Sequence, residues 1–78
     1  MKIGTVTGSV WATRKVGTLQ GQTFLVVKTE NSELVAADCV GAGAGDRVLV
    51  VFGAPARHYC ENAPVDAAVV AIVDTKKE

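Results

Sequence analysis

The side chains that could carry out nucleophilic or metal chemistry are few in this sequence, and they are scattered. The chain has two cysteines, Cys39 and Cys60, and one histidine, His58. A catalytic thiol needs a base, an orienting group and oxyanion donors around it, and a structural zinc site needs roughly four clustered ligands. The sequence therefore predicts no catalytic residue, no metal, no disulfide and no cofactor, with each cysteine acting as a small buried side chain.

A run of small residues, Gly41, Ala42, Gly43, Ala44 and Gly45, could be interpreted as a phosphate-binding loop. Such a loop lies between a strand and a helix, so that the amino end of the helix faces the phosphate. Here the residues after the run predict a strand, and no Lys-Ser or Lys-Thr pair follows. The run is better explained as a turn that needs positive φ angles or a close approach of two backbones.

The four aromatic residues raise the possibility of nucleic-acid binding. Proteins that bind single strands stack bases on exposed aromatic side chains within a basic groove. Lysine plus arginine and aspartate plus glutamate both number 8, so the formal net charge is zero. We therefore expect Phe24 and Phe52 to fill the barrel and Trp11 to pack at an interface. A binding module for single-stranded nucleic acid or a peptide remains the alternative function.

Alternating and β-branched residues predict five strands in a single domain spanning residues 1–78. Pro55, which suits the first position of a helix, indicates one short helix. The expected strands are Ile3–Thr13, Thr23–Lys28, Glu33–Asp38, Arg47–Phe52 and Ala67–Asp74, and the expected helix is Ala54–Glu61. In the first strand the even positions are small and apolar, as is typical of a barrel interior: Gly4, Val6, Gly8, Val10 and Ala12. The predicted fold class is all-β, a small five-stranded OB-like barrel with one short helix between strands four and five.

The fourth and fifth strands predict contact with another chain. Neither Val48–Phe52 nor Ala67–Val73 alternates with polar residues, so both faces of each strand are expected to be covered. A chain of 78 residues has little material for a second layer, and a domain of this size has a marginal core of its own. A neighbouring subunit is the simplest cover. The alternative is cover by the short helix and the loop around Gly17.

Three segments resemble the EutN/CcmL family of shell proteins from carboxysomes and metabolosomes. They are Met1–Thr13, VGAGAGDRVLVVFGAPAR at Val40–Arg57, and PVDAAVVAIVDT at Pro64–Thr75. Together, in this order, they cover nearly the whole chain.

This resemblance implies a structural, non-enzymatic protein that forms a homopentamer and caps the vertices of a microcompartment shell in the cytoplasm. It implies hexameric shell proteins as partners, and neither nucleic acid nor a membrane. It also implies that five residues lie at subunit contacts or near the central opening: Gly41, Ala42, Gly43, Gly45 and Arg57.

Overall fold

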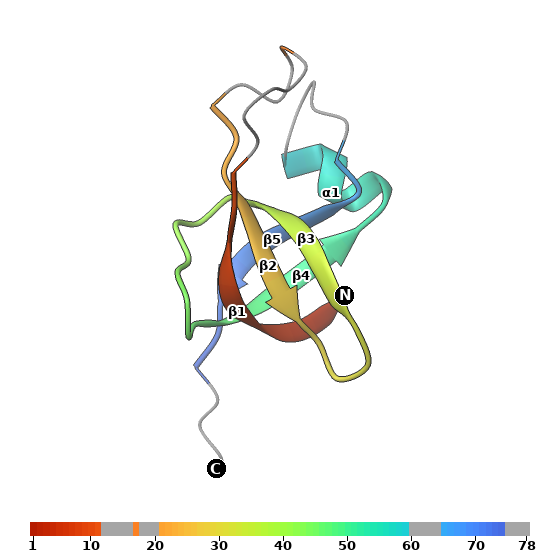
Figure 1. Cartoon of the computed structure of the whole chain (residues 1–78). Helices are drawn as coiled ribbons and strands as arrows, with labels where there is room; N and C mark the ends of the chain where they lie inside the picture. Colours follow the sequence, from red (N-terminus) through yellow and green to blue (C-terminus); the bar gives the residue numbers. More distant parts are fainter. Residues whose placement is uncertain (12–16, 18–20, 60–64, 75–78) are drawn as a thin grey trace.

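The computed structural model describes residues 1–11, 17, 21–59 and 65–74, and of residues 57–59 it describes the backbone alone. Five strands and one helix follow one another along these ranges (Figure 1). They are β1 (Lys2–Val10), β2 (Phe24–Lys28), β3 (Glu33–Asp38), β4 (Arg47–Phe52), α1 (Ala54–Tyr59) and β5 (Ala67–Ile72). The predicted fold class is confirmed, including the position of the helix between the fourth and fifth strands.

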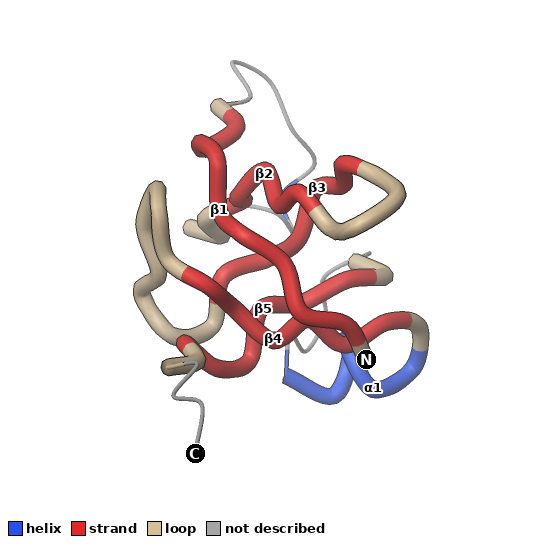
Figure 2. The backbone as a smooth tube through the Cα atoms, turned by 90° about the horizontal axis from the view of Figure 1, so that it is seen from below, coloured by secondary structure: helices blue, strands red, loops and turns tan. Residues whose placement is uncertain are grey.

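The strands close into a barrel in the order β1-β2-β3-β5-β4. Every neighbouring pair is antiparallel except β3 and β5, which run parallel with Ala37 opposite Ala68. Figure 2 shows β1 curving past β2 on one side and β4 on the other. A closed barrel leaves few unpaired strand edges. Contact with another chain is therefore expected through the outward-facing side chains.

The strand boundaries follow the predicted ranges closely. β3 and β4 have the predicted bounds, and β2 begins one residue later. β5 ends at Ile72, opposite Val48 of β4, rather than at Asp74. The last bond between them is donated by the N–H of Val73 to the carbonyl of Arg47 at 2.8 Å. Two predicted ends lie outside the described residues: Thr13 for the first strand and Glu61 for the helix.

Gly4 allows β1 to pass close to the end of β2. A Cβ atom at this position would lie 2.5 Å from the Val27 Cγ1 atom and 3.0 Å from the Lys28 carbonyl oxygen. A methyl group would clash with both. Glycine is therefore required here for close packing of two strands and not for a special φ angle.

A β-bulge in β1 changes which residues face the interior. The register with β2 shifts between Val6 and Gly8, and a bulge of this kind turns the following residues relative to the sheet. Gly4 and Val6 are buried as predicted, but Val10 is 39% exposed. The predicted inward face of the first strand is therefore wrong beyond the bulge, and Ala12 lies outside the described residues.

Small aliphatic side chains from all five strands fill the barrel. The buried cluster consists of Val6, Leu25, Val27, Ala36, Val48, Val50, Ala67 and Val69. Phe52 is half-buried and packs against this cluster, as expected. Because the interior is so narrow, valine and alanine fill it without larger residues.

A second apolar cluster lies on the outside of the barrel beneath α1. It contains Ala56 of the helix together with Ala37, Val51, Val65 and Ala68, and all five are buried. The prediction that another subunit covers β4 and β5 is wrong for this end of the strands, because the chain's own helix covers it. Phe24 packs here rather than inside the barrel, which also corrects the prediction for that residue.

Candidate assembly surface

The glycine-rich segment that joins β3 to β4 is a well-defined loop. Gly41 has a φ of 77° and Gly45 a φ of 92°, a region that side-chain-bearing residues rarely adopt. The interpretation of this segment as a turn is confirmed at these two positions. The loop is held by two carboxylates, Asp38 before it and Asp46 after it.

Asp38 organises the first half of the loop. Its Oδ1 atom accepts three backbone N–H groups, from Val40 at 3.1 Å, Gly41 at 3.1 Å and Ala42 at 3.3 Å. These are the donors that a phosphate-binding loop would offer to its ligand. Because a carboxylate of the chain itself already occupies them, the loop is not preorganised for an anion.

Asp46 closes the second half of the loop and attaches it to β1. The Asp46 Oδ2 atom accepts the N–H of Gly43 at 2.8 Å, and the Asp46 N–H donates to the Gly43 carbonyl at 3.0 Å. The N–H of Gly45 donates to the Val6 carbonyl at 2.8 Å, and the N–H of Val6 donates to the Asp46 carbonyl at 2.9 Å. The loop therefore continues the backbone pairing along the edge of β1 that β4 begins at Arg47.

Gly43 has no role within the chain that requires glycine. Its φ angle is not positive, and a Cβ atom placed on it would meet nothing within 4 Å. Gly43 and Gly41 are both exposed, while Ala42 is half-buried against the barrel core. Of the two explanations for the glycine run, a positive φ does not apply to Gly43, and a close approach of two backbones there would have to come from another chain.

Sequence reasoning missed the two aspartates that hold this loop. The detectable signal was an aspartate placed directly before the residues that lead into a glycine-rich turn, a pattern in which the carboxylate accepts the N–H groups that follow it. Arg57, the fifth predicted site residue, belongs to α1, and its side chain lies outside the described residues. Its predicted role stays a prediction.

The possible thiol and imidazole pair cannot be assembled from the described residues. The side chain of His58 and the whole of Cys60 lie outside them. Cys39 is exposed rather than buried, which corrects the expectation for that residue, and its N–H donates to the Val69 carbonyl at 3.2 Å. Within the ranges given above, no three cysteine, histidine, aspartate or glutamate residues form a group that could hold a metal ion.

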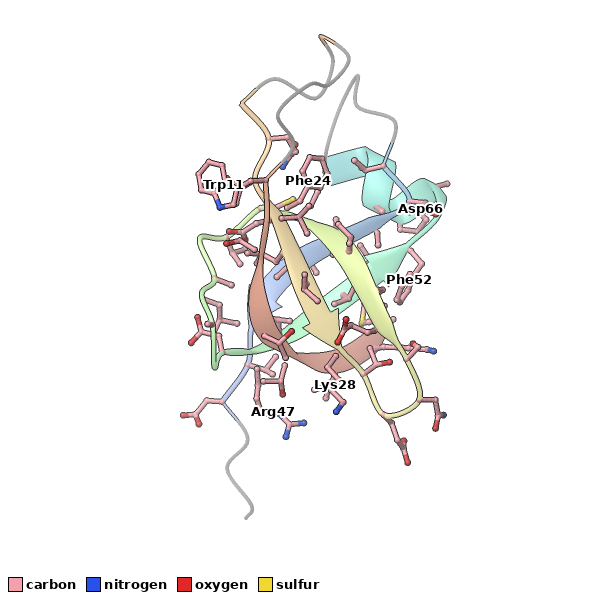
Figure 3. All side chains as sticks on the ribbon, viewed as in Figure 1. Trp11, Phe24, Lys28, Arg47, Phe52 and Asp66 are labelled. Atoms are coloured by element: carbon pink, nitrogen blue, oxygen red, sulfur yellow. The ribbon has the colours of Figure 1, made fainter. Side chains whose placement is uncertain are left out.

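The aromatic side chains that the structure describes do not form a base-stacking platform. Phe24 and Phe52 are half-buried in different clusters, and Trp11 is 89% exposed at the end of β1. Figure 3 shows Trp11 at the opposite end of the barrel from Lys28 and Arg47. The exposed aromatic ring and these two basic side chains therefore do not share one groove.

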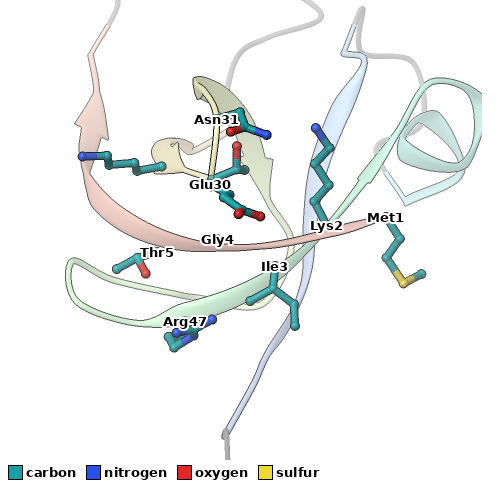
Figure 4. A pocket seen from close by; sticks show the side chains of 10 residues that line it. Met1, Lys2, Ile3, Gly4, Thr5, Glu30, Asn31 and Arg47 are labelled. Atoms are coloured by element: carbon teal, nitrogen blue, oxygen red, sulfur yellow. The ribbon is translucent and has the colours of Figure 1, made fainter.

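An open hollow of about 650 Å³ lies at the end of the barrel that carries these charges. It is bounded by residues 1–5, by the turn at residues 28–31, and by Arg47 (Figure 4). Three basic side chains, Lys2, Lys28 and Arg47, and one acidic side chain, Glu30, surround it, and none of its lining residues is aromatic. The hollow therefore lacks the stacking surface that the alternative function needs.

Comparison with known proteins identifies the family. The model of a family described as ethanolamine utilisation protein EutN/carboxysome matches residues 1–74. The chain belongs to this EutN/CcmL family. The matched residues include the glycine loop, α1 and β5, which lie in segments that carried the resemblance in the sequence.

Relatives in the EutN/CcmL family align over nearly all of the chain. The carboxysome shell vertex protein CcmL of Synechococcus elongatus is 48% identical, with 96% of this chain and 85% of the relative covered. The bacterial microcompartment shell vertex protein PduN of Salmonella typhimurium is 41% identical, with 96% and 97% covered. The solved structure of GrpN, a pentameric microcompartment shell protein from Rhodospirillum rubrum, superimposes with a TM-score of 0.88 at 40% identity, covering 100% and 99% of the two chains.

The described part of this EutN/CcmL chain contains no helix with the length and apolar character needed to cross a membrane.

Proposed function

We propose that this chain forms a homopentamer that occupies the vertices of a bacterial microcompartment shell. The observation that carries the proposal is the alignment over 100% of the chain with a pentameric shell protein, at a TM-score of 0.88 and 40% identity. Family membership and relatives named as shell vertex proteins support the same role.

A shell vertex needs a subunit ring with a different symmetry from the surrounding tiles. Flat sheets of hexagonal tiles close into a polyhedron only when pentagons are introduced at the corners. A ring closed by head-to-tail contacts between identical subunits supplies such a pentagon. We therefore include hexameric shell proteins among the partners, met at the outer rim of the ring. The zero net charge suits this role, because a strongly charged ring would repel similar neighbours.

The glycine loop is proposed to lie near the ring axis, with Gly41, Ala42, Gly43 and Gly45 close to subunit contacts. Gly43 gives the support, because nothing within its own chain requires glycine at that position. The backbone of a neighbouring subunit passing close to Gly43 would explain why this position is glycine. Arg57 is proposed to donate hydrogen bonds across the same boundary, since arginine is enriched at protein interfaces.

The proposed work of the ring is geometric rather than catalytic. Among the described residues the alternative of nucleic-acid binding is not favoured, because Trp11 lies at the opposite end of the barrel from Lys28 and Arg47 and the hollow near these two lacks aromatic lining residues.

The test is co-expression of hexameric shell proteins with and without this chain, followed by electron microscopy of the assembled particles. Open or elongated particles in its absence, and closed polyhedra containing the chain in its presence, are expected. Shells that close equally well without the chain and never incorporate it would refute the proposal.

A further inference from the structure

The outer surface of the barrel changes from apolar to charged along β2, β3 and β4. On β4 the outward residues are Val51, Leu49 and Arg47: the first is buried beneath α1, the second is half-buried, and the third is exposed. The helix therefore covers only one end of the strand. Beyond the helix, Leu49 leaves an open apolar area on β4, and Arg47 makes the area after it charged. We call these successive areas along a strand its levels: one beneath the helix, one apolar and one charged.

The same three levels recur on β2 and β3. Ladder pairing sets the outward residues of the two strands opposite one another in three pairs: Phe24 with Ala37, Val26 with Val35, and Lys28 with Glu33. The first pair belongs to the cluster beneath α1. Val35 is 49% exposed, and the last pair is fully polar. The barrel thus has two apolar areas that its own helix leaves open.

One of these areas is a row across three strands. Ile3 of β1 lies opposite Leu49 of β4, which in turn lies opposite Ala71 of β5. Ile3 is 46% exposed, and Leu49 and Ala71 are half-buried. We call this row the β4 face, and we call Val26 with Val35 the β3 face.

The two faces lie on different sides of the barrel. In the closed strand order, β1 has β4 on one side and β2 on the other, so the β4 face spans β1, β4 and β5, while the β3 face spans β2 and β3. The glycine loop is attached to β1 through the bond from the Gly45 N–H to the Val6 carbonyl. One chain therefore presents two different apolar faces, and the glycine loop continues along β1 from the start of β4.

This arrangement fits a ring closed by head-to-tail contacts. Such a ring needs two different, complementary areas on every subunit, and the wall that faces the axis lies between them. Rotation about the axis also keeps all subunits at the same height and in the same orientation. The apolar level of one face therefore meets the apolar level of the other.

We propose that the β4 face of one copy packs against the β3 face of the next copy. The occupant of each face is thus a second copy of this chain, which covers the part of β4 and β5 that α1 leaves open. This contact rests on the proposed homopentamer, in which it joins each subunit to the next around the ring.

The charges beside the two faces support this choice of occupant. Arg47 follows Leu49 on β4, and Glu33, which lies opposite Lys28 of β2, precedes Val35 on β3, so the β3 face offers Arg47 an acidic partner beside a basic one. Figure 4 shows Ile3 and Arg47 on the same side of the paired strands β1 and β4. In the ring, Arg47 lies opposite Glu33 of the neighbouring copy, and this pairing fixes the register of the contact.

The experiment uses one substitution on each face, Ile3→Glu and Val35→Glu, in the full chain. Both positions are about half exposed, so the fold tolerates a polar side chain, and circular dichroism verifies this for each variant. Asn31→Glu, in the exposed β2–β3 turn outside both faces, is the control with the same added charge. Native mass spectrometry is run on each protein alone and on an equal mixture of the two face variants.

Each face variant alone is expected to lose the ring and run as an 8.1 kDa monomer, while Asn31→Glu keeps the wild-type mass. The mixture is expected to form a dimer of one copy of each, because one intact β3 face and one intact β4 face remain. Folded face variants that assemble like wild type would overturn the inference, as would a mixture that stays monomeric.

A charge exchange gives a second test that does not depend on the apolar positions. Arg47→Glu is expected to weaken the ring by setting two acidic side chains opposite each other, and adding Glu33→Arg is expected to restore it. A double variant that assembles no better than Arg47→Glu would contradict the pairing. In both tests a wild-type chain that forms no ring would instead count against the proposed function, so the two failures are distinguishable.

Discussion

Replacing Gly4 by alanine tests the close approach of β1 to the end of β2. The added Cβ atom would lie 2.5 Å from the Val27 Cγ1 atom and 3.0 Å from the Lys28 carbonyl. The backbone oxygen cannot move without disturbing the ladder, so the strands must separate. Overpacking of this kind costs about 1–3 kcal/mol, and the lower entropy of the unfolded alanine chain offsets about 0.4–1 kcal/mol of that.

The net expectation for Gly4→Ala is a loss of about 1–2 kcal/mol in the free energy of unfolding. For a domain of this size, that loss lowers the melting temperature by roughly 5–15 °C. Melting is followed by far-ultraviolet circular dichroism at two subunit concentrations, so that any contribution from assembly shows as a concentration dependence.

Gly8→Ala is the matched control on the same strand. A Cβ atom at Gly8 meets nothing within 4 Å, and Gly8 has no positive φ, so the variant is expected to melt at or slightly above the wild-type temperature. Equal melting temperatures for Gly4→Ala and wild type would refute the explanation that Gly4 is needed for close packing of β1 against β2.

Three further substitutions test the glycine loop and the helix. Gly43→Val is expected to abolish the ring while the isolated subunit keeps its fold, because only a neighbouring chain is proposed to approach Gly43; unchanged native mass and melting would make the loop an ordinary surface turn. Asp38→Ala removes the acceptor of three N–H groups and is expected to cost about 1–3 kcal/mol of stability; hydrogen exchange should become faster at Val40 and Ala42, and unchanged protection there would contradict the role of the carboxylate. Arg57→Ala is expected to increase subunit dissociation on dilution, measured by native mass spectrometry, and a ring as resistant to dilution as wild type would remove Arg57 from the interface.

The sequence predicted the strands well because their signals are local. Valine-rich runs bounded by glycine and polar turns indicated β3 and β4 with the observed bounds. The glycine run also predicted its own turn, since positive φ angles at Gly41 and Gly45 are a property of the local backbone.

The bulge in β1 and the cover over β4 could not be predicted in the same way. The bulge depends on how β1 pairs with β2, some twenty residues away in sequence, so strict alternation wrongly placed Val10 inside. Whether α1 or a second chain covers Val51 depends on where the helix packs. Unbroken apolar runs in a sequence indicate only that another part of the protein packs on both faces of those strands.

The candidate site was predicted in part. The position of the loop was recognised from its glycines, but neither Asp38 nor Asp46 was given a role in it, although their carboxylates organise it. The open apolar faces could not be predicted from the sequence either. Ile3, Leu49 and Ala71, for example, come from three strands that only the barrel brings together.

Native mass spectrometry of the purified full chain tests the central claim most directly. Each subunit has a mass of 8.1 kDa, so a homopentamer is expected as one species near 40 kDa that persists on dilution. A chain that stays monomeric at every accessible concentration, or that forms a ring of another size, would contradict the assignment as a pentameric vertex protein.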